Sequence, residues 1–262
     1  MAKKLGFALG AGGSRGVAHI GFLQAMEEAG IRPDYVCGTS MGSVVGSCYA
    51  LGMSPEKMKE EITKLKFSEI FDLSINPLGN GALLSAKKMY KKLQQYLGDT
   101  TFDKMKIPFG CVAVDLNSGN TVFFKENKKV VDCVAASSSI PGVFRPLYLD
   151  DMVLVDGGIK CRVPVDEVRS MGADVVVAVD VLGQLRPCEK KYNMFSIIFR
   201  MADITDSELT AHKKKRQKYN LYLEPNLGNM SQYKFKNMDT AMQIGYELGK
   251  KNVNKILRLI ER

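Results

Sequence analysis

Hydrophobic positions along the chain form two alternating patterns, short continuous apolar runs and longer stretches with helical spacing. Short apolar runs bounded by turn residues are typical of strands buried in a parallel sheet. These runs lie at 4–9, 34–37, 152–156, 173–181 and 220–225. The helical stretches lie at 15–29, 54–66, 85–97, 129–137, 164–171, 191–218 and 237–260, with a further helix of small residues ending near 51. Strand, tight turn and helix occur twice in the first part of the chain, which predicts an α/β fold with a mostly parallel central sheet covered by helices.

Two connections carry additional signals. The apolar stretches PFGCVAVDL and TVFFK flank NSGN (117–120), which predicts a β-hairpin. The segment INPLGNGALL (75–84) is rich in Gly, Pro and Asn and lies between two helical stretches, which predicts a mobile loop. Together with its flanking helices it makes 54–100 a candidate cap over a site.

The length of 262 residues is sufficient for one large core, and we expect a single domain over 1–262, with its core motifs at about 5–170 and helices closing it at 190–262. A hydrophobic fraction of 45% with 25% charged residues argues against extensive disorder. The apolar runs are shorter than the roughly 18 to 20 residues that cross a bilayer. The start, MAKKLGFALGAGG, is better interpreted as a first strand than as a signal peptide, because Arg15 and His19 follow closely.

The six cysteines are scattered without zinc-ligand spacing, so we expect buried thiols in a reducing cytoplasm. The formal net charge of +9 favours a polyanionic partner, either nucleic acid or an anionic membrane. The stretch SAKKMYKKLQQYL (85–97) has lysines on one helical face and apolar residues on another, which suits attachment to an anionic bilayer. The alternative is an ordinary surface helix packed on the core. HKKKRQK (212–218) predicts a solvated charged face.

Ser40 lies in VCGTSMGSVVG (36–46), between an apolar strand and a helix of small residues. Gly38 and Gly42 complete a GxSxG pattern, in which a sharp turn needs glycine on both sides and directs the serine Oγ outward. The following helix directs its positive dipole end at the same point. We therefore take Ser40 as a candidate nucleophile, with a tight structural turn as the alternative.

The first glycine-rich turn, GAGGSRG (10–16), does not fit the dinucleotide fingerprint, because Arg15 occupies the position of its third glycine. Its small residues can still direct backbone N–H groups at an anion near a helix N-terminus. With a candidate nucleophile in the chain, we expect this loop to bind an oxyanion.

The base that would activate Ser40 is harder to identify. His19 shares a helical face with Leu23 and Met26, which is typical of a buried core histidine, and His212 precedes a run of charges. Asp156 ends an apolar strand and is followed by Gly157 and Gly158, which allow close approach of another element. A carboxylate in a poorly solvated pocket can act as a general base. The alternative for DGG is a plain turn.

Four motifs in this order resemble those of the patatin-like phospholipases in their bacterial form: GAGGSRG (10–16), GTSMG (38–42), ASSSIPGVFRP (136–146) and DGG (156–158). The resemblance covers nearly the whole chain, including LEPNLGNMSQYKF (223–235). It implies a single three-layer α/β/α domain and a Ser–Asp dyad without a catalytic histidine. The chain differs from many relatives at Ala11 and at Ser139, the second in the segment that is expected to shape the acyl pocket.

By this resemblance Ser40 is the nucleophile and Asp156 its base. The resemblance also implies an oxyanion hole made by the loop residues and by the residue after the serine. These residues are Gly12, Gly13, Ser14, Arg15 and Met41. It further implies a lipid ester substrate and no cofactor or metal. Combined with the scattered cysteines and the basic charge, this gives the expectation of a cytoplasmic enzyme with no nucleic-acid partner and with peripheral contact at the inner face of an anionic membrane.

Three functions stay open at this point. The first is a serine acyl-ester hydrolase of the phospholipase A or lysophospholipase type. The second is an acyltransferase with the same site, in which an alcohol instead of water intercepts the acyl-enzyme. The third is a non-catalytic protein that binds anionic membranes or other polyanions.

Overall fold

The computed structural model describes residues 3–65, 72–73, 82–185, 187, 194–232 and 236–261. Its main sheet has eight strands in these residues, and β11, β10, β1, β2 and β5 are parallel neighbours in that order. Antiparallel strands β6, β9 and β8 extend the sheet beyond β5. The strands are β1 (Leu5–Leu9), β2 (Tyr35–Thr39), β5 (Phe109–Asp115), β6 (Thr121–Phe124), β8 (Leu147–Leu149), β9 (Met152–Asp156), β10 (Val175–Val179) and β11 (Leu221–Leu223).

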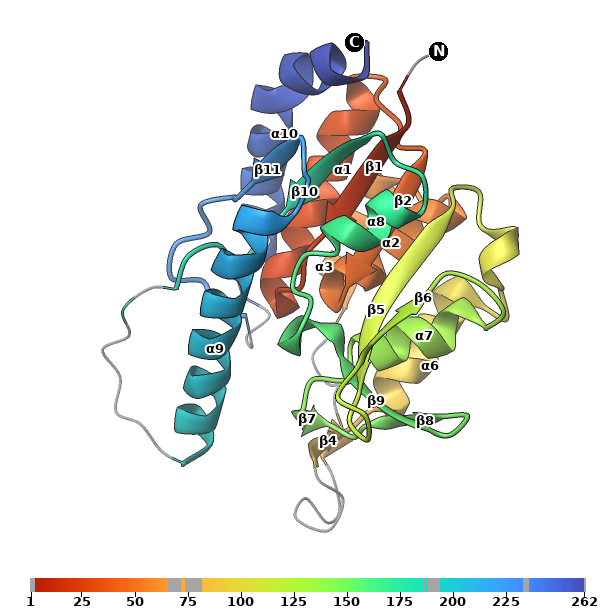
Figure 1. Cartoon of the computed structure of the whole chain (residues 1–262), viewed down its shortest axis with the longest axis vertical. Coiled ribbons are helices and arrows are strands. Elements are labelled where there is room, and N and C mark those ends of the chain that lie inside the picture. The colour runs from red at the N-terminus through yellow and green to blue at the C-terminus, as the bar shows by residue number, and fades with distance from the viewer. Residues whose placement is uncertain are drawn as a thin grey trace.

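Helices cover both faces of this sheet, which makes a three-layer α/β/α fold (Figure 1). In the view of Figure 1, α8 lies in front of the sheet, whereas α1, α2 and α10 lie behind it. The helices are α1 (Ala18–Glu28), α2 (Met41–Leu51), α3 (Pro55–Lys64), α6 (Lys87–Leu97), α7 (Val130–Ser137), α8 (Val165–Ser170), α9 (Met194–Arg216) and α10 (Met238–Ile260). The predicted mostly parallel sheet and the hairpin at NSGN are confirmed.

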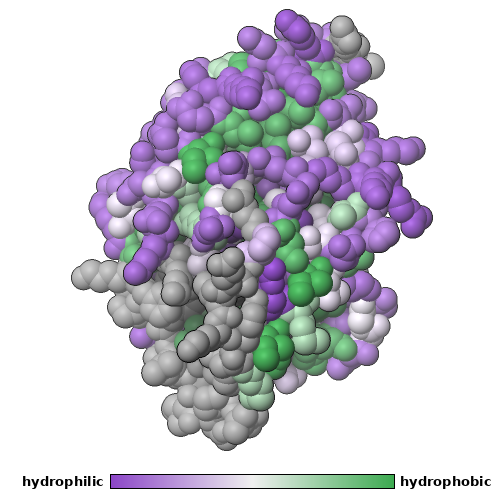
Figure 2. Space-filling view, turned by 90° about the vertical axis from the view of Figure 1, so that its left-hand side faces the viewer, coloured by the Kyte–Doolittle hydropathy of each residue, from purple (hydrophilic) through white to green (hydrophobic). Residues whose placement is uncertain are grey.

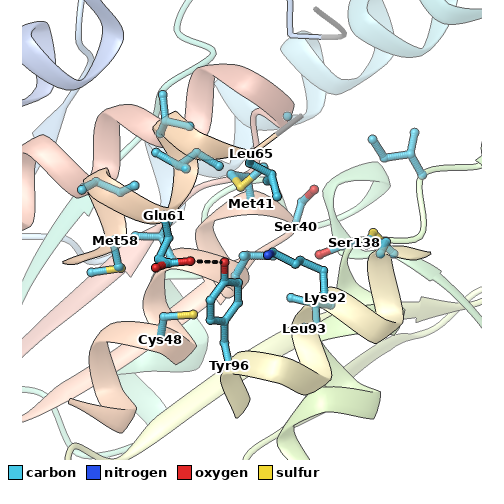
Figure 3. A pocket seen from close by; sticks show the side chains of 18 of the residues that line it. Ser40, Met41, Cys48, Met58, Glu61, Leu65, Lys92, Leu93, Tyr96 and Ser138 are labelled. Carbon is cyan, nitrogen blue, oxygen red and sulfur yellow. Dashed lines mark hydrogen bonds between the residues drawn. The ribbon is translucent and has the colours of Figure 1, made fainter. Parts of the chain in front are cut away.

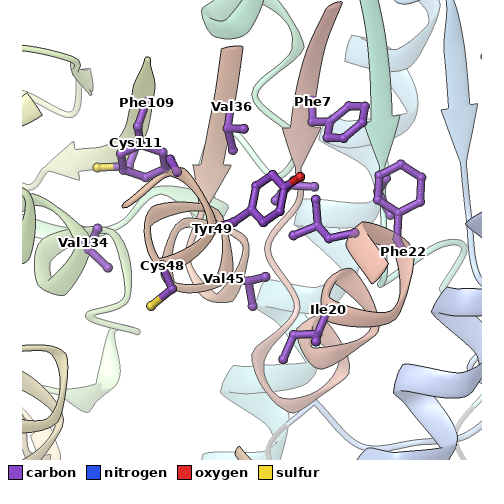
Figure 4. Close-up of a cluster of buried hydrophobic side chains, with 14 of the residues drawn as sticks. Phe7, Ile20, Phe22, Val36, Val45, Cys48, Tyr49, Phe109, Cys111 and Val134 are labelled. Atoms are coloured by element: carbon purple, nitrogen blue, oxygen red, sulfur yellow. The ribbon is translucent and has the colours of Figure 1, made fainter. Parts of the chain in front are cut away.

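The two sheet faces contact separate hydrophobic clusters. Leu5, Phe7 and Leu9 of β1 belong to the larger cluster, and Ala8 belongs to the smaller one beneath α8. This division follows from the alternation of side chains along a strand. In the larger cluster, shown in Figure 4, the rings of Phe7 and Phe22 meet edge to face with centroids 5.2 Å apart.

Helices α1 and α10 approach each other through glycines. A Cβ atom on Gly21 would lie 1.8 Å from the carbonyl oxygen of Met242, and one on Gly245 would lie 2.0 Å from that of Ala18. Only glycine permits backbones this close. The last helix is thereby fixed against the helix that follows the glycine loop, and the Lys3 N–H donates to the Ile260 carbonyl at 3.4 Å.

The cap region differs from its prediction in one respect. Residues 82–84, expected in a mobile loop, belong to strand β4 (Ala82–Ser85), which pairs with β3 (Asp72–Leu73) and with β7 (Gly142–Phe144). The rest of the predicted loop, 75–81, lies outside the described residues. Pairing with β7, a strand distant in sequence, overrides the local turn signal.

Helix α6 is a surface helix packed on the core, which was the alternative to membrane attachment. Its apolar residues Met89, Leu93 and Leu97 are buried in the larger cluster. The hydroxyl of Tyr90 donates to Asp132 at 2.7 Å. The apolar face of α6 is therefore not available to a bilayer. Among the described residues, no helix combines the length and apolarity needed to span a membrane.

Candidate active site

Ser40 occupies the turn between β2 and α2 in a backbone conformation that side chains rarely adopt, with φ 53° and ψ −125°. Such strain persists only where the surroundings enforce it, and it is common at functional sites. Steric crowding explains why glycine occupies both flanking positions of the motif. A Cβ atom on Gly38 would lie 2.3 Å from the Gly42 carbonyl oxygen, and one on Gly42 would lie 2.1 Å from that of Leu9.

Neighbouring serines hold this turn. The Ser40 N–H donates to the Ser137 Oγ at 3.0 Å, at the end of α7. The Ser40 carbonyl accepts from the Ser43 Oγ at 2.6 Å. The ASSSIPG motif therefore supports the backbone of the candidate nucleophile. Ser139 does not line the cavity described below, because its buried hydroxyl donates to the Ala135 carbonyl at 2.8 Å.

The sheet register brings Ser40 and Asp156 together although they are far apart in sequence. Thr39, the last residue of β2, pairs with Val112 of β5, and Asp156, the last residue of β9, pairs with Ala113. Because β6 occupies the opposite edge of β5 at these positions, β2 and β9 share one edge. They run in opposite directions, so their ends meet.

The backbone after Asp156 approaches the end of β2 closely. A Cβ atom on Gly157 would lie 2.3 Å from the Val112 carbonyl oxygen and 3.1 Å from the Thr39 Cγ2. Gly158 donates its N–H to Asp156 Oδ1 at 2.7 Å, which fixes the carboxyl group. The two glycines of the DGG motif thus hold the carboxyl group in position and let it reach the serine turn.

Burial raises the pKa of Asp156 to about 7, against the hydrogen bonds from the Ser40 hydroxyl and the Gly158 N–H, which favour the charged form. The negative charge of Asp206 adds to the increase. A carboxylate with a pKa near neutrality is a far stronger base than an exposed one, which is what proton removal from a serine requires.

Neither histidine is hydrogen-bonded to Ser40 in the described part of the chain. His19 is fully buried in α1, and its Nε2 lies 2.8 Å from the Gly10 carbonyl oxygen. Burial lowers its pKa to about 4. His212 lies exposed on α9. The placement of both histidines agrees with the sequence prediction.

Some backbone N–H groups of the glycine loop donate to carbonyl groups of the described residues, and others do not. The Ser14 N–H donates to the Gln232 carbonyl at 2.9 Å, and the Arg15 N–H donates to the Gly12 carbonyl at 3.0 Å. Within the described parts of the chain, no carbonyl accepts from the N–H of Gly12 or Gly13. In the predicted oxyanion set, the N–H groups of Ser14 and Arg15 are thus already engaged, which leaves Gly12, Gly13 and Met41 as donors for a ligand.

Sequence reasoning missed the role of Gln232. A Cβ atom on Gly13 would lie 2.2 Å from the Gln232 carbonyl oxygen, and the Ser14 hydroxyl donates to the Ser231 carbonyl at 2.8 Å. The segment before α10 therefore lies across the glycine loop. These contacts join positions more than two hundred residues apart, and no local pattern indicates them.

An apolar cavity of about 370 Å³ contains Ser40 in its wall. One helical face of α2 forms one side, with residues at intervals of three and four: Met41, Val44, Val45 and Cys48. Side chains of α3 and α6 close the other sides. Figure 3 shows Ser40 and Ser138 on one side of the cavity and Cys48 and Met58 on the other.

The cavity contains few polar groups besides Ser40. The Tyr96 hydroxyl donates a hydrogen bond to the Glu61 carboxylate with a length of 2.9 Å, and Figure 3 shows this pair on the side of the cavity away from Ser40. The Lys92 Nζ lies 5.2 Å from the centre of the Tyr96 ring. The Ser138 hydroxyl is buried and has no hydrogen-bond partner in the described structure. A largely apolar cavity with a few polar groups next to a serine is suited to an acyl chain.

A polar pocket of about 360 Å³ lies on the other side of the glycine loop, lined by Arg15, Arg162 and residues of α9. Arg162 is buried there and pairs with Asp180 at 3.2 Å and with Asp206 at 2.9 Å. Burial raises the pKa of Asp206 to about 6. No group of three or more metal-ligating side chains gathers in the described residues.

A strained serine and a buried carboxyl group meet at the C-terminal edge of a parallel sheet, beside an apolar cavity and a loop with available amides. This combination defines an α/β protein built around a strand–serine–helix turn. The model of the patatin-like phospholipase family matches residues 7–169, and the chain belongs to this family.

Relatives include an uncharacterized NTE family protein of Mycobacterium tuberculosis, 34% identical over 182 residues, which are 69% of this chain and 49% of the relative. Lysophospholipase nte1 of Emericella nidulans is 25% identical over 281 residues, covering 97% of this chain and 18% of the relative. The chain thus spans about half the length of the first relative and less than a fifth of the second.

Two solved structures share the fold. VipD from Legionella pneumophila superimposes with a TM-score of 0.60 and 15% identity, over 97% of this chain and 67% of VipD. The type III effector protein ExoU superimposes with a TM-score of 0.50 and 11% identity, over 97% of this chain and 53% of ExoU. Both likenesses concern the fold.

Proposed function

We propose that this protein is a serine acyl-ester hydrolase that cleaves fatty acyl esters of lipids, with Ser40 as nucleophile and Asp156 as its base. The observation that carries the proposal is the meeting of β2 and β9 on β5, which places the Ser40 hydroxyl against the buried Asp156 carboxylate. The apolar cavity supports a lipid substrate. The relative named lysophospholipase nte1 supports a phospholipid or lysophospholipid as its class.

In the first step, the Ser40 Oγ attacks the ester carbonyl carbon while its proton passes to Asp156. The resulting oxyanion is placed to accept hydrogen bonds from the N–H groups of Gly12, Gly13 and Met41, with the positive end of the α2 dipole adding to its stabilisation. Asp156 then gives its proton to the departing alcohol, and the acyl chain stays on Ser40 in the cavity.

In the second step, a water molecule gives a proton to Asp156 and attacks the acyl-enzyme carbonyl. The tetrahedral intermediate collapses, the proton returns to Ser40, and a fatty acid leaves. An alcohol in place of water would give a new ester, which is the acyltransferase alternative. Product analysis with and without glycerol or a lysolipid separates the two reactions.

The test is covalent labelling with a fluorophosphonate probe, followed by turnover of a p-nitrophenyl ester. We expect the probe to label the wild type and to fail to label Ser40→Ala. Labelling should be retained in Ser47→Ala, the control, because Ser47 is a buried serine of α2 whose hydroxyl donates to the Val44 carbonyl at 3.0 Å. Turnover should fall at least a hundredfold in Asp156→Asn and persist in Asp150→Asn.

The histidine variants decide between dyad and triad. We expect His212→Ala to retain labelling and turnover when folded, and likewise His19→Gln, whose amide group can still donate to the Gly10 carbonyl. A folded histidine variant without activity would replace the dyad by a triad. A wild type that neither labels nor turns over, but binds anionic vesicles or DNA in a salt-dependent way, would instead support the non-catalytic binding protein.

A further inference from the structure

The first half of α9 exposes a row of large apolar side chains. Their exposed fractions are 66% for Met194, 47% for Ile197, 56% for Ile198, 61% for Met201 and 45% for Ile204. Intervals of three and four residues place them on one helical face. Contiguous exposed apolar surface of this kind marks an interaction site in a folded protein.

The opposite face of the same helix is attached to the site. Phe199 lines the apolar cavity, Asp203 accepts a hydrogen bond from the Gln232 side chain at 2.8 Å, and Asp206 pairs with the buried Arg162 at 2.9 Å. Because these contacts fix the rotation of α9 about its axis, the apolar row points outward as a consequence of the fold.

The position of α9 relates the row to the cavity. The helix runs along the left-hand side of the molecule in Figure 1, and its first residues lie at the end toward which the central parallel strands run and where β2 leads into Ser40. Figure 2 views this side and shows hydrophobic side chains exposed in the lower half of the face as well as higher up. An occupant of this face would lie beside the cavity.

The charges on and near α9 favour an anionic partner for this face. Between Met194 and Ile204 the only acidic residue is Asp203, which is turned toward Gln232, so the outward row carries no negative charge. The last turn of α9 contains Lys213, Lys214, Lys215 and Arg216, and the whole chain has a net charge of +9. A helix with an exposed apolar face and a cationic end can lie in the plane of an anionic bilayer.

We propose that the outward face of α9, formed by Met194, Ile197, Ile198, Met201 and Ile204, is the surface by which the protein docks on an anionic lipid bilayer. This inference rests on the proposed function, because docking there would bring a lipid ester beside the cavity that contains Ser40. The proposed membrane-binding helix is therefore α9 and not α6, the helix suggested by the sequence, because the apolar face of α6 is buried.

The test uses the triple variant Ile197→Gln, Ile198→Gln, Met201→Gln, which removes apolar surface without changing net charge. Binding is measured by co-sedimentation with vesicles of phosphatidylcholine and phosphatidylglycerol, in a Ser40→Ala background so that no catalysis intervenes. The matched control is Leu116→Gln, an exposed leucine outside α9 with a 49% exposed fraction.

We expect at least tenfold weaker vesicle binding in the triple variant and a change of less than twofold in the control. With Ser40 restored, the triple variant should hydrolyse a soluble p-nitrophenyl butyrate at the wild-type rate and lose turnover on vesicles. Vesicle binding unchanged by the triple substitution overturns the proposal. So does a wild-type dimer in sedimentation velocity that the triple substitution dissociates, because the face would then join two copies of the chain.

Failure of the proposed function gives a different result. Absence of fluorophosphonate labelling at Ser40 would contradict the hydrolase assignment while leaving vesicle binding measurable in the same protein.

Discussion

The Nε2 atom of His19 lies 2.8 Å from the carbonyl oxygen of Gly10, the residue at which the glycine loop begins. Since a carbonyl oxygen only accepts hydrogen bonds, this nitrogen carries the proton. The Nδ1 atom is buried without a partner among the described residues. The contact makes His19 a support of the loop and removes it from direct chemistry at Ser40.

This placement predicts acid sensitivity of the fold. The pKa of His19 falls from 6.5 in its unperturbed state to about 4 on burial, so the unfolded chain binds the proton more tightly. Stability is fully present above pH 6.5 and is lost as the pH falls toward 4, by on the order of 3 kcal/mol. Urea unfolding of the wild type and His19→Gln between pH 4 and 8 measures this. An equal slope in both proteins would contradict the assignment.

Asp156 predicts the pH dependence of turnover. Its carboxylate must be ionised to accept the Ser40 proton, so kcat/KM should rise about tenfold per pH unit below pH 7 and level off above it. Asp206→Asn removes a negative charge that raises the pKa of Asp156, and should move this limb to lower pH. A profile without a limb between pH 5 and 8 would argue against Asp156 as the base.

The same carboxyl group predicts a stability cost at neutral pH. Because its pKa is about 7 in the fold and 3.8 without burial, the native state keeps the proton longer, and stability falls as the pH rises through this interval. Asp156→Asn lacks this loss, which is on the order of 4 kcal/mol. Chemical denaturation should therefore show that the unfolding free energy of Asp156→Asn increases relative to that of the wild type as the pH rises from 4 to 8. A constant difference would mean that the carboxyl group is not desolvated.

Two adjacent serines allow a matched comparison. Ser137→Ala leaves the buried Ser40 N–H without its partner and should cost about 1–3 kcal/mol of unfolding free energy, with loss of turnover. Ser138→Ala removes a hydroxyl that has no partner among the described residues, so its stability should change by less than about 0.5 kcal/mol. Equal destabilisation in urea unfolding would show that the Ser137 contact does not hold the turn.

The α2 face of the cavity predicts a limit on acyl-chain length. Cys48 lies about 10 Å along the helix from Met41, at a rise of 1.5 Å per residue. Cys48→Phe should fill the far end of the cavity and lower turnover of p-nitrophenyl palmitate at least tenfold relative to the butyrate. Cys48→Ala is the control and should accept both esters. An unchanged preference in Cys48→Phe would place the acyl chain elsewhere.

Much of the fold follows from local patterns in the sequence. The continuous apolar runs that form β1, β2 and β10 are buried in the centre of the sheet, where both faces are covered and no alternation is required. The turn at Ser40 is also predictable, since a serine flanked by glycines between a strand and a helix is typical of this sharp turn. Single-domain organisation and the role of each site residue stay predictions.

Long-range contacts decide the rest. Amphipathicity locates a face on α6 but does not say whether protein or membrane covers it, and Met89 and Leu93 are in fact buried. The stretch 191–218 is predicted only as a closing helix, and local sequence does not say that one apolar face of α9 is exposed to solvent. The engagement of Ser14 by Gln232 depends on a segment from the other end of the chain, so local sequence does not distinguish occupied loop amides from available ones.

The hydrogen bond from the Lys3 N–H to the Ile260 carbonyl joins the first strand region to the end of α10. Both ends of the described chain emerge side by side, at the end of the molecule opposite the turn that contains Ser40 (Figure 1). A label or tag attached at either of these ends would therefore start at the far side of the sheet from the turn between β2 and α2.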